Sequence, residues 1–368
     1  MIFKTKHKSL KFLYVFIVGV FGASCQLSRM IWYNFADIND YKIFPSRLLQ
    51  KSSLPFQFYA DERPLYPKYI QQKPFEQFLR DTKTVAFLII KNDTILYEKY
   101  FFDYTEKSIV PSFSMAKSVT SLLIGCAIDD KYIQSVNEPV TNYIPELKKN
   151  RFDKVTIRHL LQMTSGIKFK ENYFNPFGDA ARFYYGNHLR KKILKMKLKK
   201  EPGKQFEYVS GNTQVLGWVL ERALKNKTIT QYLQERIWTP LGMEFDATWS
   251  IDNKRNGIEK TFCCLNARAR DFAKIGRLYL HNGNWNGRQI VSSGWIELLT
   301  RPDTTQGAVS YYQYQWWLPT PGKDFLAEGF LGQYIYVNPS RNLIIVRLGK
   351  KEGKANWWAV FRELAMYY

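Results

Sequence analysis

The sequence predicts an α+β fold, in which helices flank an antiparallel sheet and a mainly helical subdomain is inserted between the strands. A β-hairpin is expected at residues 84–101, because two runs rich in β-branched and aromatic residues are separated by Asn92 and Asp93. Apolar residues then recur at helical spacing within residues 156–280. Strand-like segments return only at residues 311–348, so distant parts of the chain are expected to share one sheet.

Each element has its own sequence signal. Residues 74–80 favour a short helix that begins at a proline, and glycine or proline residues mark the ends of the later helices. The predicted hairpin strands are residues 84–90 and 94–101. The predicted longer helices are residues 156–163, 213–223, 229–238, 267–280 and 356–368, and the late strands are residues 311–318, 325–328, 333–337 and 343–348.

The composition limits the classes of partner. The chain has 368 residues, 45% of them hydrophobic, with 26 Phe, 24 Tyr and 10 Trp, which suffices for a large core. The formal net charge of +22 fits nucleic acid, an anionic membrane surface or simply a lysine-rich composition. No zinc-finger spacing, RNA-binding signature or helix-turn-helix pattern occurs in the sequence, so nucleic acid is not expected as a partner.

The first 25 residues have the pattern of an export signal. Four lysines precede the apolar residues 12–24, and Cys25 follows them. Three alternatives stay open: a cleaved signal peptide, a lipoprotein signal with lipid on Cys25, or an uncleaved membrane anchor. We expect an exported protein that is anchored to the bacterial cell envelope, with residues 26–74 as an extended spacer.

A dense basic run occupies residues 190–200. One interpretation is a solvated helix face. The other is a surface that is attracted to anionic lipid or to an envelope polymer close to the anchor.

The cysteines and histidines predict neither a metal site nor a cofactor. Cys126 falls on an apolar helix face, which favours a buried thiol. Cys263 and Cys264 are adjacent, so a disulfide between them is expected to be strained. No Cys or Cys/His set has metal-binding spacing, and the 4 His residues are scattered.

The segment at residues 111–127 contains the first candidate catalytic motif. A helix is predicted from Ser114 onward, and Ser114 and Lys117 share one face of its first turn. A hydroxyl there lies in the positive field of the helix N-terminus, and a desolvated lysine beside it can accept the hydroxyl proton near neutral pH. The alternative is an N-capping serine followed by a solvated lysine.

Tyr208 is the candidate second base. A phenol acts as a phenolate only near a cation, and Lys117 could provide that cation. The alternative is a core tyrosine whose hydroxyl has a hydrogen-bond partner.

Six segments of the chain form a further pattern. They are Phe-Ser-Met-Ala-Lys-Ser at 113–118, Thr-Ile-Arg-His-Leu-Leu-Gln-Met-Thr-Ser-Gly at 156–166, Pro-Gly-Lys-Gln-Phe-Glu-Tyr at 202–208, Pro-Leu-Gly-Met at 240–243, Ala-Arg-Asp-Phe-Ala at 269–273 and Gly-Phe-Leu-Gly-Gln at 329–333. In this order they resemble the serine β-lactamase-related hydrolases, the class C-like superfamily that includes D-alanyl-D-alanine carboxypeptidases, certain esterases and 6-aminohexanoate-oligomer hydrolases. The segment at 208–213 is most similar to the 6-aminohexanoate branch. The resemblance implies a β-lactamase/DD-peptidase-like fold and a serine hydrolase domain at residues 75–368.

The resemblance also implies roles for individual residues. Ser114 would be the acylated nucleophile, Lys117 its base and Tyr208 the acid/base at the leaving group. Ser210 stands where the second motif usually has asparagine and Asn212 follows two positions later, so either could support Lys117. The third motif usually begins with a cation, but here it is Ala327-Glu328-Gly329. The oxyanion hole would combine the amide of Ser114 with that of Phe330, next to Gly329.

These observations predict an exported serine hydrolase that cleaves an amide or ester through a Ser114 acyl-enzyme. A small or peptide-like substrate is expected, and the missing third-motif cation argues against an efficient β-lactamase. The alternative is a catalytically silent envelope binding or scaffold protein that retains the fold. The acyl group, the leaving group and the oligomeric state are not predicted.

Overall fold

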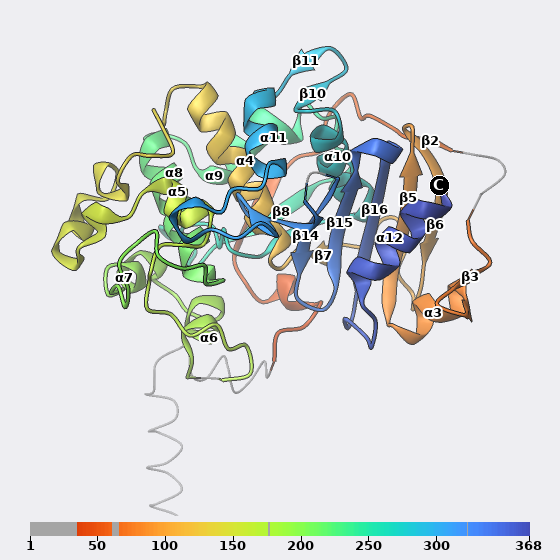
Figure 1. Ribbon diagram of the computed structural model, residues 1–368, viewed down its shortest axis with the longest axis horizontal. Coiled ribbons are helices and arrows are strands. Elements are labelled where there is room, and N and C mark those ends of the chain that lie inside the picture. The colour runs from red at the N-terminus through yellow and green to blue at the C-terminus, as the bar shows by residue number, and fades with distance from the viewer. Residues whose placement is uncertain (1–34, 61–65, 176, 322) are drawn as a thin grey trace, which may run out of the picture.

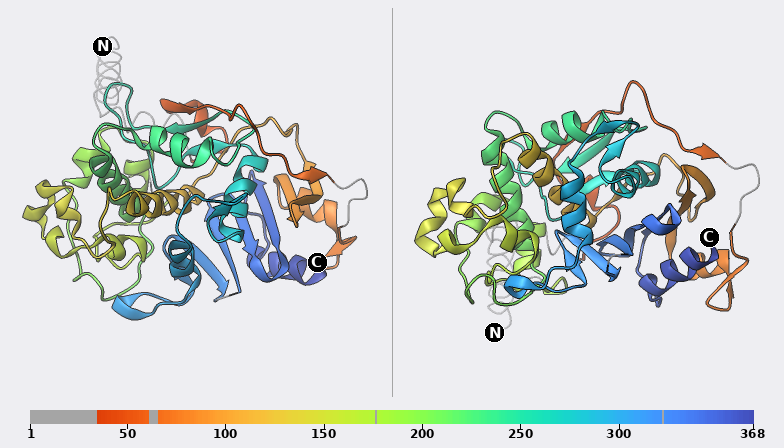
Figure 2. Two further views of the ribbon diagram at one scale, coloured as in Figure 1. Left: turned by 90° about the horizontal axis from the view of Figure 1, so that it is seen from above. Right: turned by 45° about the horizontal axis from the view of Figure 1, so that its top comes forward.

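The computed structural model describes residues 35–60, 66–175, 177–321 and 323–368 (Figure 1). These residues form a mixed α+β structure, which confirms the predicted fold class (Figures 1 and 2). The predicted signal, anchor or lipid site at residues 1–25 lies outside the described residues. Within the described part of the chain, no helix is both long and apolar enough to cross a bilayer.

The main sheet has eight strands in the order β12-β13-β14-β15-β16-β5-β6-β2. The predicted hairpin is β5 (Thr84–Lys91) and β6 (Thr94–Tyr100), joined by Asn92 and Asp93 with positive φ. β16 (Leu343–Gly349) pairs antiparallel with β5, so the C-terminal strands extend the early hairpin, as predicted. The other strands are β2 (Tyr59–Ala60), β12 (Tyr312–Gln313), β13 (Trp316–Thr320), β14 (Asp324–Gly329) and β15 (Gln333–Asn338).

Helices cover both faces of this sheet. On one face, α3 (Phe75–Asp81) and α12 (Trp357–Tyr367) bury aromatic side chains in a common cluster with alternate residues of the central strands. On the other face, α10 (Ala269–Leu280) packs on β15 and β16, and α4 (Met115–Asp129) packs on β14. Gly276 allows the close approach of α10, because a Cβ there would lie 2.9 Å from Ile335 Cγ2.

α4 lies between the sheet and the helical subdomain, so almost all of its length is buried. The helical subdomain contains α5 (Ile157–Leu161), α6 (Asp179–Tyr184), α7 (Leu189–Ile193), α8 (Ser210–Leu224), α9 (Ile229–Leu233), a π-helical turn (Gln234–Trp238) and the 3-10 turns Val140–Asn142, Pro145–Asn150 and Phe152–Lys154. α8 packs against both α4 and α5. The segment that carries Tyr208 therefore ends next to the segment that carries Ser114.

A second sheet determines where α4 begins. Its order is β1 (Ser46–Leu49), β8 (Ala247–Ser250), β9 (Leu265–Ala267) and β7 (Val110–Pro111). β7 ends three residues before Ser114, so its pairing with β9 fixes the entry to α4. The predicted spacer thus contributes β1 and β2 to two different sheets.

The remaining elements lie at the edges. They are α11 (Ser293–Thr300) and the small hairpins of β3 (Tyr69–Ile70) with β4 (Lys73–Pro74) and of β10 (Asn284–Trp285) with β11 (Arg288–Gln289). The single strand predicted at residues 311–318 is wrong in one respect. It is split into β12 and β13, because Tyr314 and Gln315 adopt φ of 44° and 70° and reverse the chain.

Candidate active site

Ser114 lies at the junction between β7 and α4, with its side chain free of any capping bond. The amide of Ser112 donates to the Leu265 carbonyl at 2.8 Å, and the Ser112 hydroxyl accepts from the Leu265 amide at 3.2 Å. Phe113 has φ of 45°, which a phenylalanine rarely adopts, and its ring contacts those of Tyr184 and Phe330. The two-way pairing with β9 and the ring contacts therefore hold a strained turn that presents the Ser114 hydroxyl.

Lys117 is buried beside that hydroxyl. Its side chain is only 1% exposed, and its Nζ donates to Ser114 Oγ at 2.7 Å and to the Phe262 carbonyl at 3.1 Å. Burial lowers the pKa of Lys117 to about 8, although the negative charge of Glu171 acts in the opposite direction. The alternative of a solvated lysine and a capping serine is therefore wrong.

Tyr208 completes a group of three side chains. Its ring centroid is 4.9 Å from Lys117 Nζ, and its ring is stacked on Trp317 at 5.6 Å. Burial raises the pKa of Tyr208, the charge of Glu171 raises it further, and a hydrogen bond with Ser114 acts in the opposite direction. The expected phenolate is thus not supported, because burial and the charge of Glu171 both favour the neutral phenol.

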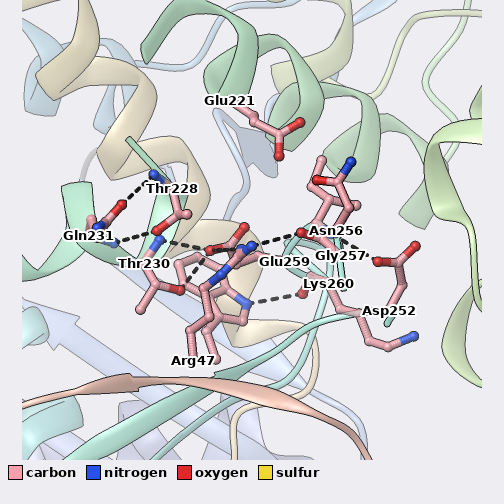
Figure 3. Close-up of polar contacts among 12 residues, drawn as sticks. Arg47, Glu221, Thr228, Thr230, Gln231, Asp252, Asn256, Gly257, Glu259 and Lys260 are labelled. Atoms are coloured by element: carbon pink, nitrogen blue, oxygen red, sulfur yellow. Dashed lines mark hydrogen bonds and ion pairs between the residues drawn. The ribbon is translucent and has the colours of Figure 1, made fainter. Parts of the chain in front are cut away.

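The Phe262 carbonyl belongs to the segment of residues 259–265, which contacts α4. The buried carboxylate of Glu259 accepts from the Thr230 amide at 3.0 Å and forms an ion pair with Arg47 at 2.7 Å (Figure 3). The backbone carbonyl of Thr261 accepts from Thr120 of α4 at 2.9 Å. Charged and polar contacts of the residues just before Phe262 therefore fix the acceptor for the Lys117 amine.

Cys263 and Cys264 continue this segment and form a disulfide with each other. Both residues are buried, and Cys264 has φ of 70°. The Cys263 carbonyl accepts from the Trp249 indole at 3.1 Å, and the Cys264 carbonyl accepts from the Ser250 amide at 3.0 Å. The disulfide thus lies between Phe262, whose carbonyl accepts from Lys117, and β9, whose residue Leu265 bonds to Ser112. Cys126 is a buried free thiol, as predicted.

Neither predicted supporter of Lys117 contacts it. The Ser210 amide donates to Glu171 at 2.8 Å, and its hydroxyl donates to the same carboxylate. Asn212 accepts from the Ser165 hydroxyl and donates to Met163 Sδ at 3.2 Å. Ser210 therefore acts on Lys117 only through Glu171, and the Phe262 carbonyl takes the expected place of a side-chain partner.

Gly329 and Phe330 lie beside the nucleophile, as the oxyanion-hole prediction requires. A Cβ at Gly329 would lie 2.3 Å from the Ser112 carbonyl and 3.3 Å from the Ser114 amide nitrogen, so only glycine fits this contact. Among the described residues, the amides of Ser114 and Phe330 have no hydrogen-bond acceptor. Two unpaired amides next to Ser114 Oγ are suited to a developing oxyanion.

The third motif provides a carboxyl group in place of a cation. Ala327 is fully buried against the α4 side of β14. Glu328 accepts from the Trp358 indole at 3.0 Å, and burial raises its pKa to about 7. It is close enough to Tyr208 for its charge to raise the pKa of that phenol. Anionic groups on a substrate therefore meet no third-motif cation here.

Residues 72–358 match the family model described as Beta-lactamase, which is most of the chain. The chain belongs to the beta-lactamase family. It is 27% identical over 299 residues to the 6-aminohexanoate-dimer hydrolase of Paenarthrobacter ureafaciens, covering 74% of each chain.

Solved structures with the same beta-lactamase family fold are similar to this chain. A Bacillus anthracis structure with a provisional 6-aminohexanoate-dimer hydrolase assignment has a TM-score of 0.79 and 25% identity, covering 90% of this chain and 92% of its own. A family VIII carboxylesterase has a TM-score of 0.61 and 18% identity, covering 80% of this chain and 95% of its own, and it shows the fold alone. The predicted family is confirmed, and this family member is homologous to hydrolases.

The sequence does not reveal two parts of this beta-lactamase family site, the Phe262 carbonyl and the Glu171 carboxylate. The disulfide between Cys263 and Cys264, which the sequence predicts to be strained if formed, is present. Glu171 lies in a loop whose conformation the sequence does not specify, and it is distant from the second motif along the chain, so no sequence signal marks it. Within the described ranges, no group of three His, Cys, Asp or Glu side chains could hold a metal ion.

Proposed function

We propose that this member of the beta-lactamase family is a serine hydrolase that cleaves an amide or ester bond through a Ser114 acyl-enzyme. The observation that carries the proposal is the 2.7 Å contact between Ser114 Oγ and a lysine that is 1% exposed. A lysine serves as a base only when it loses its proton near working pH, and burial lowers the pKa of Lys117 to about 8. A purely structural lysine would gain nothing from being buried beside a hydroxyl.

In the proposed mechanism, neutral Lys117 accepts the Ser114 proton as Oγ bonds to the substrate carbonyl carbon. The amides of Ser114 and Phe330 stabilise the oxyanion of the tetrahedral intermediate. When the bond to the leaving group breaks, neutral Tyr208 donates a proton to the leaving nitrogen or oxygen and regains one from Lys117. Water then attacks the acyl-enzyme, its proton passes through the same two groups, and Ser114 is released with the acid product.

The substrate class is part of this proposal. The 6-aminohexanoate-dimer hydrolase similarity supports a linear amide, and the carboxylesterase fold neighbour supports an ester. The buried carboxyl of Glu328 disfavours substrates that carry a carboxylate near the third motif. Linear amides and short-acyl esters are therefore proposed, with β-lactams as poor substrates.

We also propose that the chain is exported and anchored to the cell envelope. The support is the basic head, the apolar residues 12–24 and Cys25, which lie outside the described residues. This proposal has three forms: a cleaved signal peptide, a lipid on Cys25 or an uncleaved membrane anchor.

A fluorophosphonate probe tests the enzyme proposal. Ser114 should form the adduct, and Ser114→Ala should abolish both labelling and ester turnover, whereas Ser53→Ala, at an exposed serine, should change neither. Mass spectrometry locates the adduct, and circular dichroism verifies folding. An adduct on another residue would reject Ser114 as the nucleophile, and no adduct on folded protein would favour the alternative of a silent binding protein.

A further inference from the structure

Glu328 is a half-buried carboxyl group beside the proposed oxyanion hole. It directly precedes Gly329, where a Cβ would lie 3.3 Å from the Ser114 amide nitrogen. Ala327 packs on the α4 side of β14, so the alternation of the strand turns the Glu328 side chain the other way, toward Trp358 of α12. The Trp358 indole donates to Oε2 of Glu328 at 3.0 Å, and in the described part of the chain no hydrogen bond is formed to Oε1. One oxygen of this carboxyl group is therefore available to a ligand.

Among the described residues, no cationic side chain forms an ion pair with Glu328. Burial raises the pKa of Glu328 to about 7, the hydrogen bond from Trp358 acts in the opposite direction, and the charge of the carboxylate of Glu352 raises the pKa further. The hydroxyl of Tyr334, which is opposite Glu328 in the sheet, has a smaller lowering effect. Arg347 lies in the same region, but its guanidinium donates to backbone carbonyls, and the carboxylate whose charge acts on it is Glu352. A ligand cation at Glu328 therefore does not have to displace a cation of the described chain.

Aromatic rings connect Glu328 with the catalytic group. The ring centroid of Trp358 is 5.7 Å from that of Trp317, and Trp317 is stacked on Tyr208 at 5.6 Å. Tyr311, whose side chain is 45% exposed, is stacked on Trp317 at 6.4 Å. The rings of Trp358, Trp317 and Tyr208 are only half-buried, so a ligand can reach them. Aromatic rings next to a carboxylate are suited to an ammonium ion, because both the rings and the carboxylate attract a cation.

The leaving group is the part of the substrate that reaches these rings. In the proposed mechanism Tyr208 donates a proton to the leaving group. Besides burial, the charges of Glu171 and Glu328 raise the pKa of Tyr208, so both carboxylates lie near this proton donor. Lys117 is also close, with its Nζ 4.9 Å from the centroid of the Tyr208 ring, but this lysine is neutral when it acts as the base. A leaving group that extends from Tyr208 along Trp317 therefore meets negative charge and aromatic rings.

We propose that Glu328, Trp317 and Trp358 form a binding site for a cation that the leaving group of the substrate carries. The cation is an ammonium group, primary or quaternary, a few bonds from the ester oxygen or the amide nitrogen. This inference rests on the proposed hydrolase function and narrows its substrate class to esters of amino alcohols and amides of diamines. Such a leaving group has the opposite charge to the carboxylate that a cation in the third motif would bind.

Matched pairs of substrates test this cation site on the full chain at about pH 8, where Glu328 is ionised. The first pair is butyrylcholine and the neutral ester in which carbon replaces its ammonium nitrogen. The second pair is the butanoyl monoamide of trimethylenediamine and the butanoyl amide of butylamine. The charged member of at least one pair should have a kcat/KM at least roughly tenfold higher, since the attraction of the carboxylate and that of the rings act together. The pair that shows the difference distinguishes a quaternary from a primary ammonium group.

Glu328→Gln tests the residue that carries the charge. The glutamine amide oxygen still accepts from Trp358, so the variant removes the charge and keeps the hydrogen bond. The ratio of kcat/KM between the charged and the neutral substrate should fall to about threefold or less, the part that the rings contribute. Glu363→Gln is the matched control, because Glu363 is a half-buried residue of the same helix as Trp358 and accepts from the Gln71 amide at 3.4 Å. This control should leave the ratio as it is in the unmodified protein.

Calorimetry on Ser114→Ala separates the cation site from the proposed hydrolase activity. This variant should bind butyrylcholine at least roughly tenfold more tightly than the neutral ester, and the addition of Glu328→Gln should remove most of the difference. Equal kcat/KM within both substrate pairs, or a preference that Glu328→Gln leaves intact, would overturn the cation site while the hydrolase proposal stands. Selective binding of butyrylcholine without turnover of any of the four substrates by the unmodified protein would support the cation site and reject the hydrolase.

Discussion

The carbonyl oxygen of Phe262 lies 3.1 Å from Nζ of Lys117, a residue 145 positions earlier in the chain. A carbonyl is only an acceptor, so it must take one N–H of the lysine in either protonation state. When Lys117 is neutral, this bond leaves its lone pair available to Ser114 Oγ, 2.7 Å away. The backbone at Phe262 therefore orients the base and offsets part of its charge when it is protonated.

The first prediction concerns the two acid/base residues. Lys117→Ala and Tyr208→Phe should each lower kcat by roughly a hundredfold or more, the usual contribution of general acid–base catalysis. Their effects should not multiply in the double variant, because the two groups transfer the same protons. Full activity of Tyr208→Phe would show that Tyr208 is a core residue without a catalytic role.

The pH dependence follows from the lowered pKa of Lys117. The base must be neutral, so kcat/KM should rise with pH and level off above about 8, the pKa that burial gives to this lysine. Lys117→Ala should lack this rise. A rate that falls across the same interval would show that the charged lysine is the active form and would reject the mechanism.

Glu171 should tune that pH profile. Its charge raises the pKa of Lys117, so Glu171→Gln should let burial lower that pKa further and move the rising limb of kcat/KM toward lower pH. Glu207→Gln is the matched control, since Glu207 also lies near the second motif but pairs with Lys199. An unchanged pH profile in Glu171→Gln would show that Glu171 binds the Ser210 amide but does not affect the pKa of Lys117.

The parts of the site that could be predicted from the sequence are those formed by residues close together in the chain. Ser114 and Lys117 are three positions apart, so the helical period alone places them together, and the hairpin at Asn92 and Asp93 is equally local. The Phe262 carbonyl is a backbone group that any residue carries, so no residue type marks it. The position of that carbonyl depends on the ion pair of Glu259 with Arg47, two residues that are far apart in the sequence. The turn at Tyr314 and Gln315 was missed because neither residue is a usual choice for positive φ.

The predicted location is tested by fractionation. Full-length protein should sediment with membranes, and mass spectrometry of its N-terminal peptide should distinguish lipid on Cys25 from a cleaved signal or an intact apolar run. Replacing Cys25 with serine should release the protein only in the lipid form. Recovery of the full-length chain in the cytosol would refute export.

The last prediction concerns substrate charge at the third motif. A charge contact at about 4 Å is worth on the order of 4 kcal/mol at an effective dielectric constant of 20, before desolvation, so even a part of it changes specificity tenfold. Uncharged short-acyl esters and linear amides should therefore have a much higher kcat/KM than nitrocefin or penicillin. The carboxyl of Glu328, whose pKa burial raises to about 7, should make this gap wider above pH 7, where it is ionised, than below.

Glu328→Gln provides the decisive variant for that prediction. It should raise kcat/KM for nitrocefin by roughly tenfold at pH 8, where it removes a negative charge, and have little effect at pH 6. The uncharged ester serves as the internal control, since Glu328→Gln should leave its kcat/KM equal to that of the unmodified protein at each of the two pH values. Ala327→Lys is less informative, because Ala327 is fully buried and a cation there would destabilise the fold. Efficient nitrocefin hydrolysis by the unmodified protein would show that another cation binds the substrate carboxylate and that Glu328 does not set the specificity.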